Sequence, residues 1–144
     1  MKKKPNLMAA MTPFPYSVQL HTLLSDATKL MQEHEVHHLP IMEQREIVGV
    51  ITKHDIKARG ALLLENEDEG KLQVKDACIS VPYIVDINEP LENVLLTMAK
   101  KHQNSALVTK HDKLVGIFTY IDVCRYLGLY LKEKFSTSDG NEAA

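Results

Sequence analysis

The chain repeats itself without a gap at an offset of 67 residues. Thr52 and Thr119 are 67 positions apart (119 − 52), and the same offset relates Asp55 to Asp122. Further identical pairs at this offset are Pro15 with Pro82, Tyr16 with Tyr83, Val18 with Val85, Leu24 with Leu91, Met31 with Met98, Val48 with Val115, and Gly49 with Gly116. Chance does not produce so many matches in one ungapped register, so the chain is one structural unit written twice.

Each unit predicts the order strand, helix, strand, strand, helix. In the first unit, residues 16–20 alternate at the strand period of two, and apolar residues within 23–31 recur at helical spacing. Two short apolar runs, 39–42 and the β-branched 47–51, predict strands joined by a polar turn. A helix over about 52–64 closes the unit.

The second unit predicts the same order of elements. It has a strand over 83–87, a helix opened by Pro90, strands over 106–108 and 114–118, and a helix over 119–131. The sequence therefore indicates a mixed α/β (α+β) fold built from two β-α-β-β-α repeats.

The predicted boundaries follow from where the repeat and the apolar pattern stop. The first repeat covers residues 7–64 and the second covers 74–131. An acidic, solvated linker over 65–73 joins them, and the polar residues 132–144 are predicted to form a disordered tail.

Composition restricts the class of protein further. With 144 residues, of which 44% are hydrophobic and 25% charged, the chain can bury a core of its own. A net charge of −2 provides no field that would recruit nucleic acid or an anionic membrane. No apolar stretch has the length of a membrane helix, and Cys78 and Cys124 form neither a disulfide framework nor a metal-type spacing. We therefore expect a cytoplasmic protein.

The doubled motif Gly-x-x-Thr-x-x-Asp, over residues 49–55 and 116–122, resembles the cystathionine-β-synthase-type (CBS) domain family. Similar family-like stretches are Ala-Met-Thr-Pro at 10–13, His-Leu-Pro-Ile at 38–41 and Val-Lys-Asp at 74–76. The resemblance covers about residues 7–131. It implies two repeats related by a pseudo-twofold axis, with a cleft between them. Such pairs commonly bind AMP, ADP, ATP or S-adenosylmethionine, regulate another protein, and dimerise.

Thr-x-x-Asp has two physical interpretations. A threonine at a helix N-cap and an acid three residues later satisfy free backbone N–H groups, at roughly 1 kcal/mol per cap. The same helix end suits a phosphate, a threonine hydroxyl can donate to a phosphate oxygen, and a carboxylate can accept from both ribose hydroxyls. The resemblance assigns these binding roles to Thr52 and Asp55, and to Thr119 and Asp122.

Two further features also have two interpretations each. The resemblance places Pro15 and Tyr16, and likewise Pro82 and Tyr83, beside the adenine, where a tyrosine ring could pack on the base. The alternative is a tyrosine at a strand edge. The glycine that begins each motif either eases a β-bulge or lets the backbone approach a ligand.

Histidines cluster before the first motif. His34 to His38 matches the H-E-x-x-H zinc-protease pattern, but Pro40 follows and the repeat predicts a helix-to-strand change there, so protease activity is not expected. The cluster instead places protonatable or positive groups near the first Thr–Asp pair: His37, His38, Lys53 and His54. Their counterparts in the second unit, Asn104, Ser105, Tyr120 and Ile121, are uncharged. The first half is thus expected to bind charged ligands more strongly, the alternative being an ordinary basic edge.

These observations predict a non-enzymatic sensor that binds an adenine nucleotide or another adenosyl ligand and acts on a partner protein in trans. We find no nucleophile–base pair, metal cage or glycine-rich phosphate loop in the sequence. No cofactor is expected apart from this ligand, and a homodimer is. A ligand-free protein-interaction module is the alternative from another class, and a histidine-based metal binder is a third. The identity of the ligand, the regulated partner and the orientation of the dimer stay open.

Overall fold

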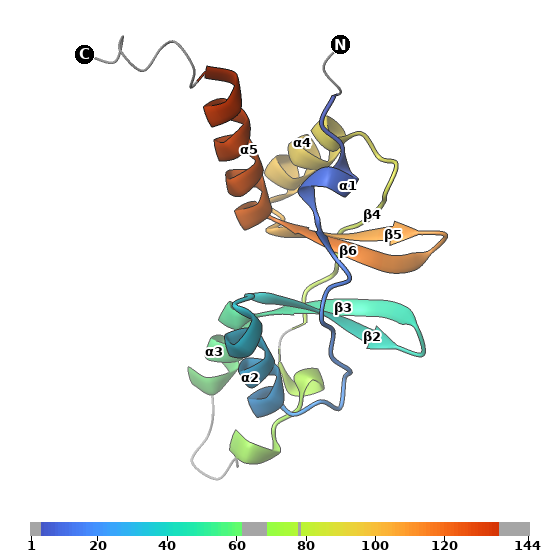
Figure 1. Cartoon of the computed structure of the whole chain (residues 1–144). Helices are drawn as coiled ribbons and strands as arrows, with labels where there is room; N and C mark the ends of the chain where they lie inside the picture. Colours follow the sequence, from blue (N-terminus) through green and yellow to red (C-terminus); the bar gives the residue numbers. More distant parts are fainter. Residues whose placement is uncertain (1–3, 62–68, 78, 136–144) are drawn as a thin grey trace, which may run out of the picture.

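The computed structural model describes residues 4–61, 69–77 and 79–135 of the chain. They form two α/β halves, and the β2–β3 hairpin of the first half faces the β5–β6 hairpin of the second (Figure 1). The helices lie on the sides of these hairpins that point away from the other half. The predicted fold class and the repeated order of elements are confirmed.

The first half contains a helix, a hairpin, a second helix and two short 3-10 helices. Its elements are α2 (Leu24–His34), β2 (His38–Glu43), β3 (Glu46–Thr52), α3 (Lys53–Ala61), η1 (Glu69–Lys71) and η2 (Val74–Asp76). Strands β2 and β3 pair antiparallel. The apolar positions of α2 that the sequence spaces at helical intervals, Leu24, Ala27 and Met31, are buried in the core of this half.

The second half is a four-stranded sheet with three helices. Its elements are α1 (Leu7–Ala10), β1 (Thr12–Pro13), β4 (Ile84–Asp86), α4 (Leu91–Lys101), β5 (Ser105–Lys110), β6 (Lys113–Thr119) and α5 (Tyr120–Phe135). The strand order is β1-β6-β5-β4, with β4 parallel to β5 and the other pairs antiparallel.

A short segment before each repeat packs in the other half. Leu7 and Ala10 of α1 are buried in the second-half core, and β1 adds a strand to β6. In the same way, Val74 and Ala77 are buried in the first-half core. Figure 1 shows the chain leaving α1 beside α4 and α5 and then crossing to the first half. The halves in space are therefore not the repeats in sequence, because residues 7–13 exchange sides with residues 74–80.

The strand predicted over residues 16–20 is reduced to one bridge. Only Val18 pairs with Ile41, whereas β4, its counterpart, has three paired residues. The N–H of Gln19 donates to the Thr22 hydroxyl at 2.9 Å, and the N–H of Leu20 donates to the Glu43 carboxylate at 2.7 Å. Side chains thus take the backbone donors, and the ladder does not extend.

The other elements differ from prediction mainly at their ends. Helix α5 continues through Phe135, so residues 132–135 are helical and the predicted end at 131 was too early. Helix α3 is described to Ala61. Most of the predicted linker (65–68 of 65–73), Cys78 and residues 136–144 of the predicted tail lie outside the described residues.

The glycine of each motif lies beside a β-bulge. The register shifts opposite Gly49, between Ile41 and Met42, and shifts at the equivalent place opposite Gly116. A Cβ at Gly49 would collide with Cγ2 of Ile79, and one at Gly116 would collide with the thioether of Met11. Both interpretations thus contribute, but the group that approaches the backbone is a side chain of the exchanged segment.

Candidate functional site

The first Thr–Asp pair forms a capping box at the start of α3. The N–H of Thr52 donates to Oδ2 of Asp55 at 2.9 Å, and the N–H of Asp55 donates to the Thr52 hydroxyl at 3.1 Å. Among the described residues, no other group donates to this carboxylate, which is half-buried. The capping interpretation is therefore confirmed here, and Oδ1 of Asp55 keeps its acceptor capacity.

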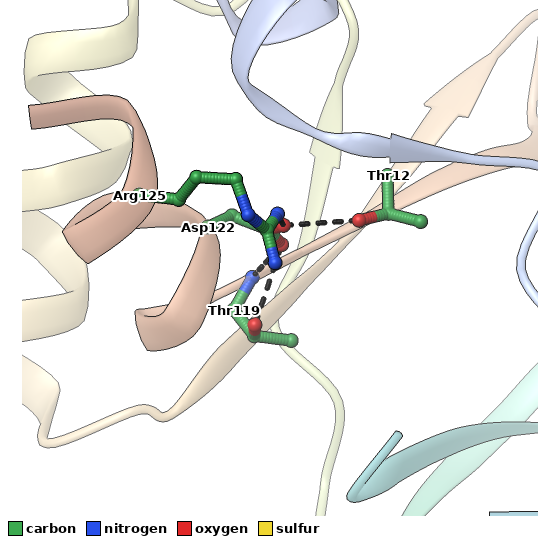
Figure 2. A network of polar contacts seen from close by, with 4 residues as sticks. All are labelled: Thr12, Thr119, Asp122 and Arg125. Atoms are coloured by element: carbon green, nitrogen blue, oxygen red, sulfur yellow. Dashed lines mark hydrogen bonds and ion pairs between the residues drawn. The ribbon is translucent and has the colours of Figure 1, made fainter. Parts of the chain in front are cut away.

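The second pair is part of a larger network, shown in Figure 2. The carboxylate of Asp122 accepts from the N–H of Thr119 at 2.8 Å and from its hydroxyl at 3.3 Å. It also accepts from the Thr12 hydroxyl at 2.9 Å and from the Arg125 guanidinium at 3.1 Å. Asp122 is buried, at 4% exposure, which is consistent with a carboxylate that is fully hydrogen-bonded.

The two networks differ because the repeat diverges at two positions. At the offset of 67 residues, Thr12 corresponds to Ile79 and Arg125 corresponds to Ala58. Neither Ile79 nor Ala58 has a side chain that can donate a hydrogen bond. Thr12 reaches Asp122 because β1 belongs to the exchanged segment and pairs with β6. The exchange of segments thus decides which acid receives the extra donors.

A cavity of about 240 Å³ lies between the two halves beside Asp122. We call it the interface cavity. Thr12, Ile117, Thr119, Tyr120, Ile121, Asp122 and Arg125 line it from one side, and Glu35, Val36, His37 and His38 line it from the other. The structure therefore brings together four predicted site residues from both repeats: His37, His38, Thr119 and Asp122.

His38 lies at the centre of this contact between halves. It pairs with Thr52 across the β2–β3 hairpin, and its ring meets the Tyr120 ring edge-on, with centroids 6.2 Å apart. Burial lowers the pKa of His38 below its usual value of 6.5; His37 lowers it further, while Asp55 and Asp122 act in the opposite direction. The prediction that His38 brings a charge to the first pair is thus modified: the side chain lies between both pairs and is held neutral.

A second cavity, of about 380 Å³, lies within the first half between α2 and α3. His37 and Lys53 line it together with Thr28, Met31, Gln32, Glu35, Val36, Ile56 and Lys57. It shares Glu35, Val36 and His37 with the interface cavity. His54, Thr52 and Asp55 are not among the described residues that line either cavity.

The predicted adenine-side tyrosines contact helices. The Tyr16 ring stacks on His34 with centroids 3.7 Å apart, and Lys101 lies over the Tyr83 ring at 5.9 Å. His34 and Lys101 are themselves related by the offset of 67 residues, so both tyrosines are held in the same way. These two tyrosines and the prolines before them, Pro15 and Pro82, are likewise not among the described lining residues of the two cavities.

The H-E-x-x-H pattern does not lie on one helix. Helix α2 ends at His34, Glu35 is left-handed with φ of 53°, and the last histidine of the pattern, His38, is in β2. The predicted helix-to-strand change is therefore confirmed, and the two terminal histidines of the pattern do not share a helical face.

Sequence reasoning missed Arg125 and Thr12. The comparison of cations between the halves covered the motif and the residues before it and stopped short of Arg125, one helical turn after Asp122. The i, i+3 spacing was the available signal. Thr12 stands in the family-like stretch Ala-Met-Thr-Pro, but its contact depends on the segment exchange, which no periodicity reveals. The second half is therefore not without a cation.

The sequence profile of the CBS domain matches the chain twice, over residues 7–61 and 74–129. Because these matches cover most of the chain, this protein belongs to the CBS domain family and is a tandem CBS domain pair. Among curated relatives, Hypoxic response protein 1 of Mycobacterium tuberculosis is 29% identical over 108 residues, which is 74% of each chain.

Solved CBS pairs have the same fold. The structure of CBSX2 in complex with AMP is 27% identical, with a TM-score of 0.71 over 90% of this chain and 99% of that one. A CBS domain pair in complex with 5′-methylthioadenosine and S-adenosyl-L-methionine is 23% identical, with a TM-score of 0.74 over 86% of this chain and 100% of that one. The second similarity shows the fold alone. Within the part of the chain that is described, no helix is long and apolar enough to cross a membrane.

Proposed function

We propose that this CBS domain pair binds an adenine nucleotide or a related adenosyl ligand at the interface cavity, and that binding regulates a partner protein in trans. The observation that carries the proposal is the composition of one cavity. Thr119 and Asp122 of the second repeat line it together with His37 and His38 of the first. A ligand there touches both halves, so it favours one arrangement of the halves over another.

In this proposal Asp122 accepts hydrogen bonds from the ribose hydroxyls, and the Thr119 hydroxyl, released from Asp122, donates to a phosphate oxygen. The start of α5, a helix of 16 residues, adds backbone donors to the same place. The AMP complex of CBSX2 supports the choice of ligand class, since that protein shares 27% identity and the fold with this chain. Thr52 and Asp55 form a second candidate site, whose ribose acceptor is the oxygen that the cap leaves open. His54 and Lys53 beside this pair, and the Pro15–Tyr16 and Pro82–Tyr83 segments beside the base, remain part of the proposal.

The test is to identify what the protein carries and what it binds. Small molecules released from purified, denatured protein are identified by mass spectrometry, and the protein is titrated calorimetrically with AMP, ADP, ATP and S-adenosylmethionine. We expect at least one adenosyl ligand to bind with a dissociation constant well below about 1 mM. If none does, the proposal fails, and a ligand-free interaction module becomes the better account.

We also propose that the chain forms a homodimer through exposed apolar side chains of α5. Leu127, Leu129 and Leu131 are 52%, 62% and 46% exposed. So much apolar surface on one helix is typical of a protein interface. The three leucines at 62–64, which the sequence also suggested for this contact, lie outside the described residues. Light scattering should give twice the chain mass of 16.3 kDa, and a monomer at micromolar concentration would overturn this.

A further inference from the structure

The interface cavity contains an arginine that has no counterpart in the first half. Arg125 lies one helical turn after Asp122 on α5, and Ala58 occupies the equivalent place in the first repeat. Its side chain is 60% exposed, whereas that of Asp122 is 5% exposed. One end of this ion pair is therefore fixed in the protein, while the other end can reorient at the cavity.

A ligand that binds Asp122 changes the partners of this arginine. Oδ1 of Asp122 accepts from both Thr12 and Arg125 in the unliganded protein. Together with Oδ2, which accepts twice from Thr119, the carboxylate already takes four donors. Because a carboxylate has about four acceptor positions, two ribose hydroxyls have to displace existing donors. Arg125 is the most exposed of these donors, so its departure costs the least desolvation.

We propose that the interface cavity selects adenosyl ligands that carry a phosphate, and that Arg125 is the residue that binds this phosphate. The inference rests on the proposed function and narrows its ligand class. A guanidinium presents a planar set of donors that matches two phosphate oxygens at once. When the ribose takes over Asp122, the phosphate replaces Asp122 as the anionic partner of Arg125, so the cation is never left unpaired.

Ligands without a phosphate do not complete this exchange. Adenosine offers no anion, so binding it would leave the displaced Arg125 paired only with water. S-adenosylmethionine brings a sulfonium cation next to its ribose and carries its carboxylate at the far end of the methionine chain. Both ligands lose the Arg125–Asp122 ion pair and gain no replacement for it.

The other charged residue of the lining limits the size of this selectivity. Glu35 reaches the interface cavity from the first half and is exposed. Its carboxylate repels a phosphate, although solvent screens the repulsion. Glu35→Gln should therefore raise the affinity for AMP severalfold and leave that for adenosine unchanged, opposite in sign to the loss of Arg125.

The experiment is a calorimetric titration with AMP, adenosine and S-adenosylmethionine on the full chain. The wild type is compared with Arg125→Gln and with Lys132→Gln, which removes one positive charge two turns further along α5 and away from the cavity. We expect the wild type to prefer AMP over adenosine by about tenfold or more. Arg125→Gln should lose most of that preference without weakening adenosine, and Lys132→Gln should keep it.

The outcomes separate this inference from the proposed function. If the wild type binds adenosine or S-adenosylmethionine as tightly as AMP, the ligand class is wrong while the proposed function stands. If Arg125→Gln is folded by its thermal melt and keeps the preference for AMP, Arg125 is not the phosphate-binding residue. If no adenosyl compound binds the wild type, both the inference and the proposed function are overturned.

Discussion

The two Thr–Asp pairs have the same sequence pattern and different structural roles. Asp55 accepts one hydrogen bond, from the N–H of Thr52, and completes a helix cap. Asp122 accepts four, including one from Thr12, which lies 110 residues earlier in the chain. The same motif thus ends one helix locally and, in the other half, ties the exchanged N-terminal segment to the start of α5. Divergence outside a motif can change the role of the motif itself.

The largest expected difference between the pairs is in stability. Asp122→Ala removes the acceptor of buried donors from Thr119 and Thr12, so we expect a loss of roughly 2–3 kcal/mol in the free energy of unfolding. Asp55→Ala removes only a cap and should cost about 1 kcal/mol. Denaturant unfolding of both variants measures the difference. Equal losses would mean that the contacts of Thr12 and Arg125 add nothing to the second pair.

The two motif glycines provide a second test of the exchanged segments. Gly49→Ala meets Ile79, whose β-branched side chain is stiff, so we expect a loss of about 1–3 kcal/mol. Gly116→Ala meets the end of Met11, a flexible side chain that can move aside, and should cost no more than about 1 kcal/mol. Thermal and denaturant unfolding of the two variants gives the order. The reverse order would contradict the packing described for these segments.

A smaller effect is expected from pH through His38. Since burial lowers the pKa of His38 in the folded protein, the unfolded chain binds more protons below about pH 6.5. Stability contributed by neutral His38 is therefore complete above that pH and falls as the solution is acidified. His38→Gln should lose less stability than the wild type between about pH 7.5 and about pH 5.5. The neighbouring exposed His37→Gln is the control; if it behaves like His38→Gln, burial is not the cause.

Local patterns predicted the halves well, because the repeat and the periods of 2 and 3.6 are properties of neighbouring residues. The helix around Met31 and the strands around Ile41 and Val50 follow directly from them. The position of Leu7 in the opposite core could not be predicted, because an apolar residue in a short segment fits either half equally well. The first strand beyond Val18 failed for another reason, since side-chain acceptors took its backbone donors.

The candidate site was predicted only as far as the repeat is exact. The motif identified Thr119 and Asp122, but the cation that accompanies them, Arg125, lies where the two units differ. The expected advantage of the first half depended on its histidines and Lys53, and His37 and His38 also reach the interface cavity beside the second pair. On this geometry we expect loss of Asp122 to weaken nucleotide binding more than loss of Asp55.

The most direct test of the proposed site is a thermodynamic cycle between Asp122 and the ribose hydroxyls. Asp122→Asn should weaken AMP binding by roughly tenfold to hundredfold, which corresponds to about 1.5–3 kcal/mol. A 2′,3′-dideoxy analogue of AMP should lose a similar amount on the wild type and little more on Asp122→Asn, because both changes delete one interaction. Asp55→Asn serves as the matched control, and thermal melts accompany each titration. If Asp122→Asn melts early yet binds AMP like the wild type, the second Thr–Asp pair is only a structural network and the proposed site is wrong.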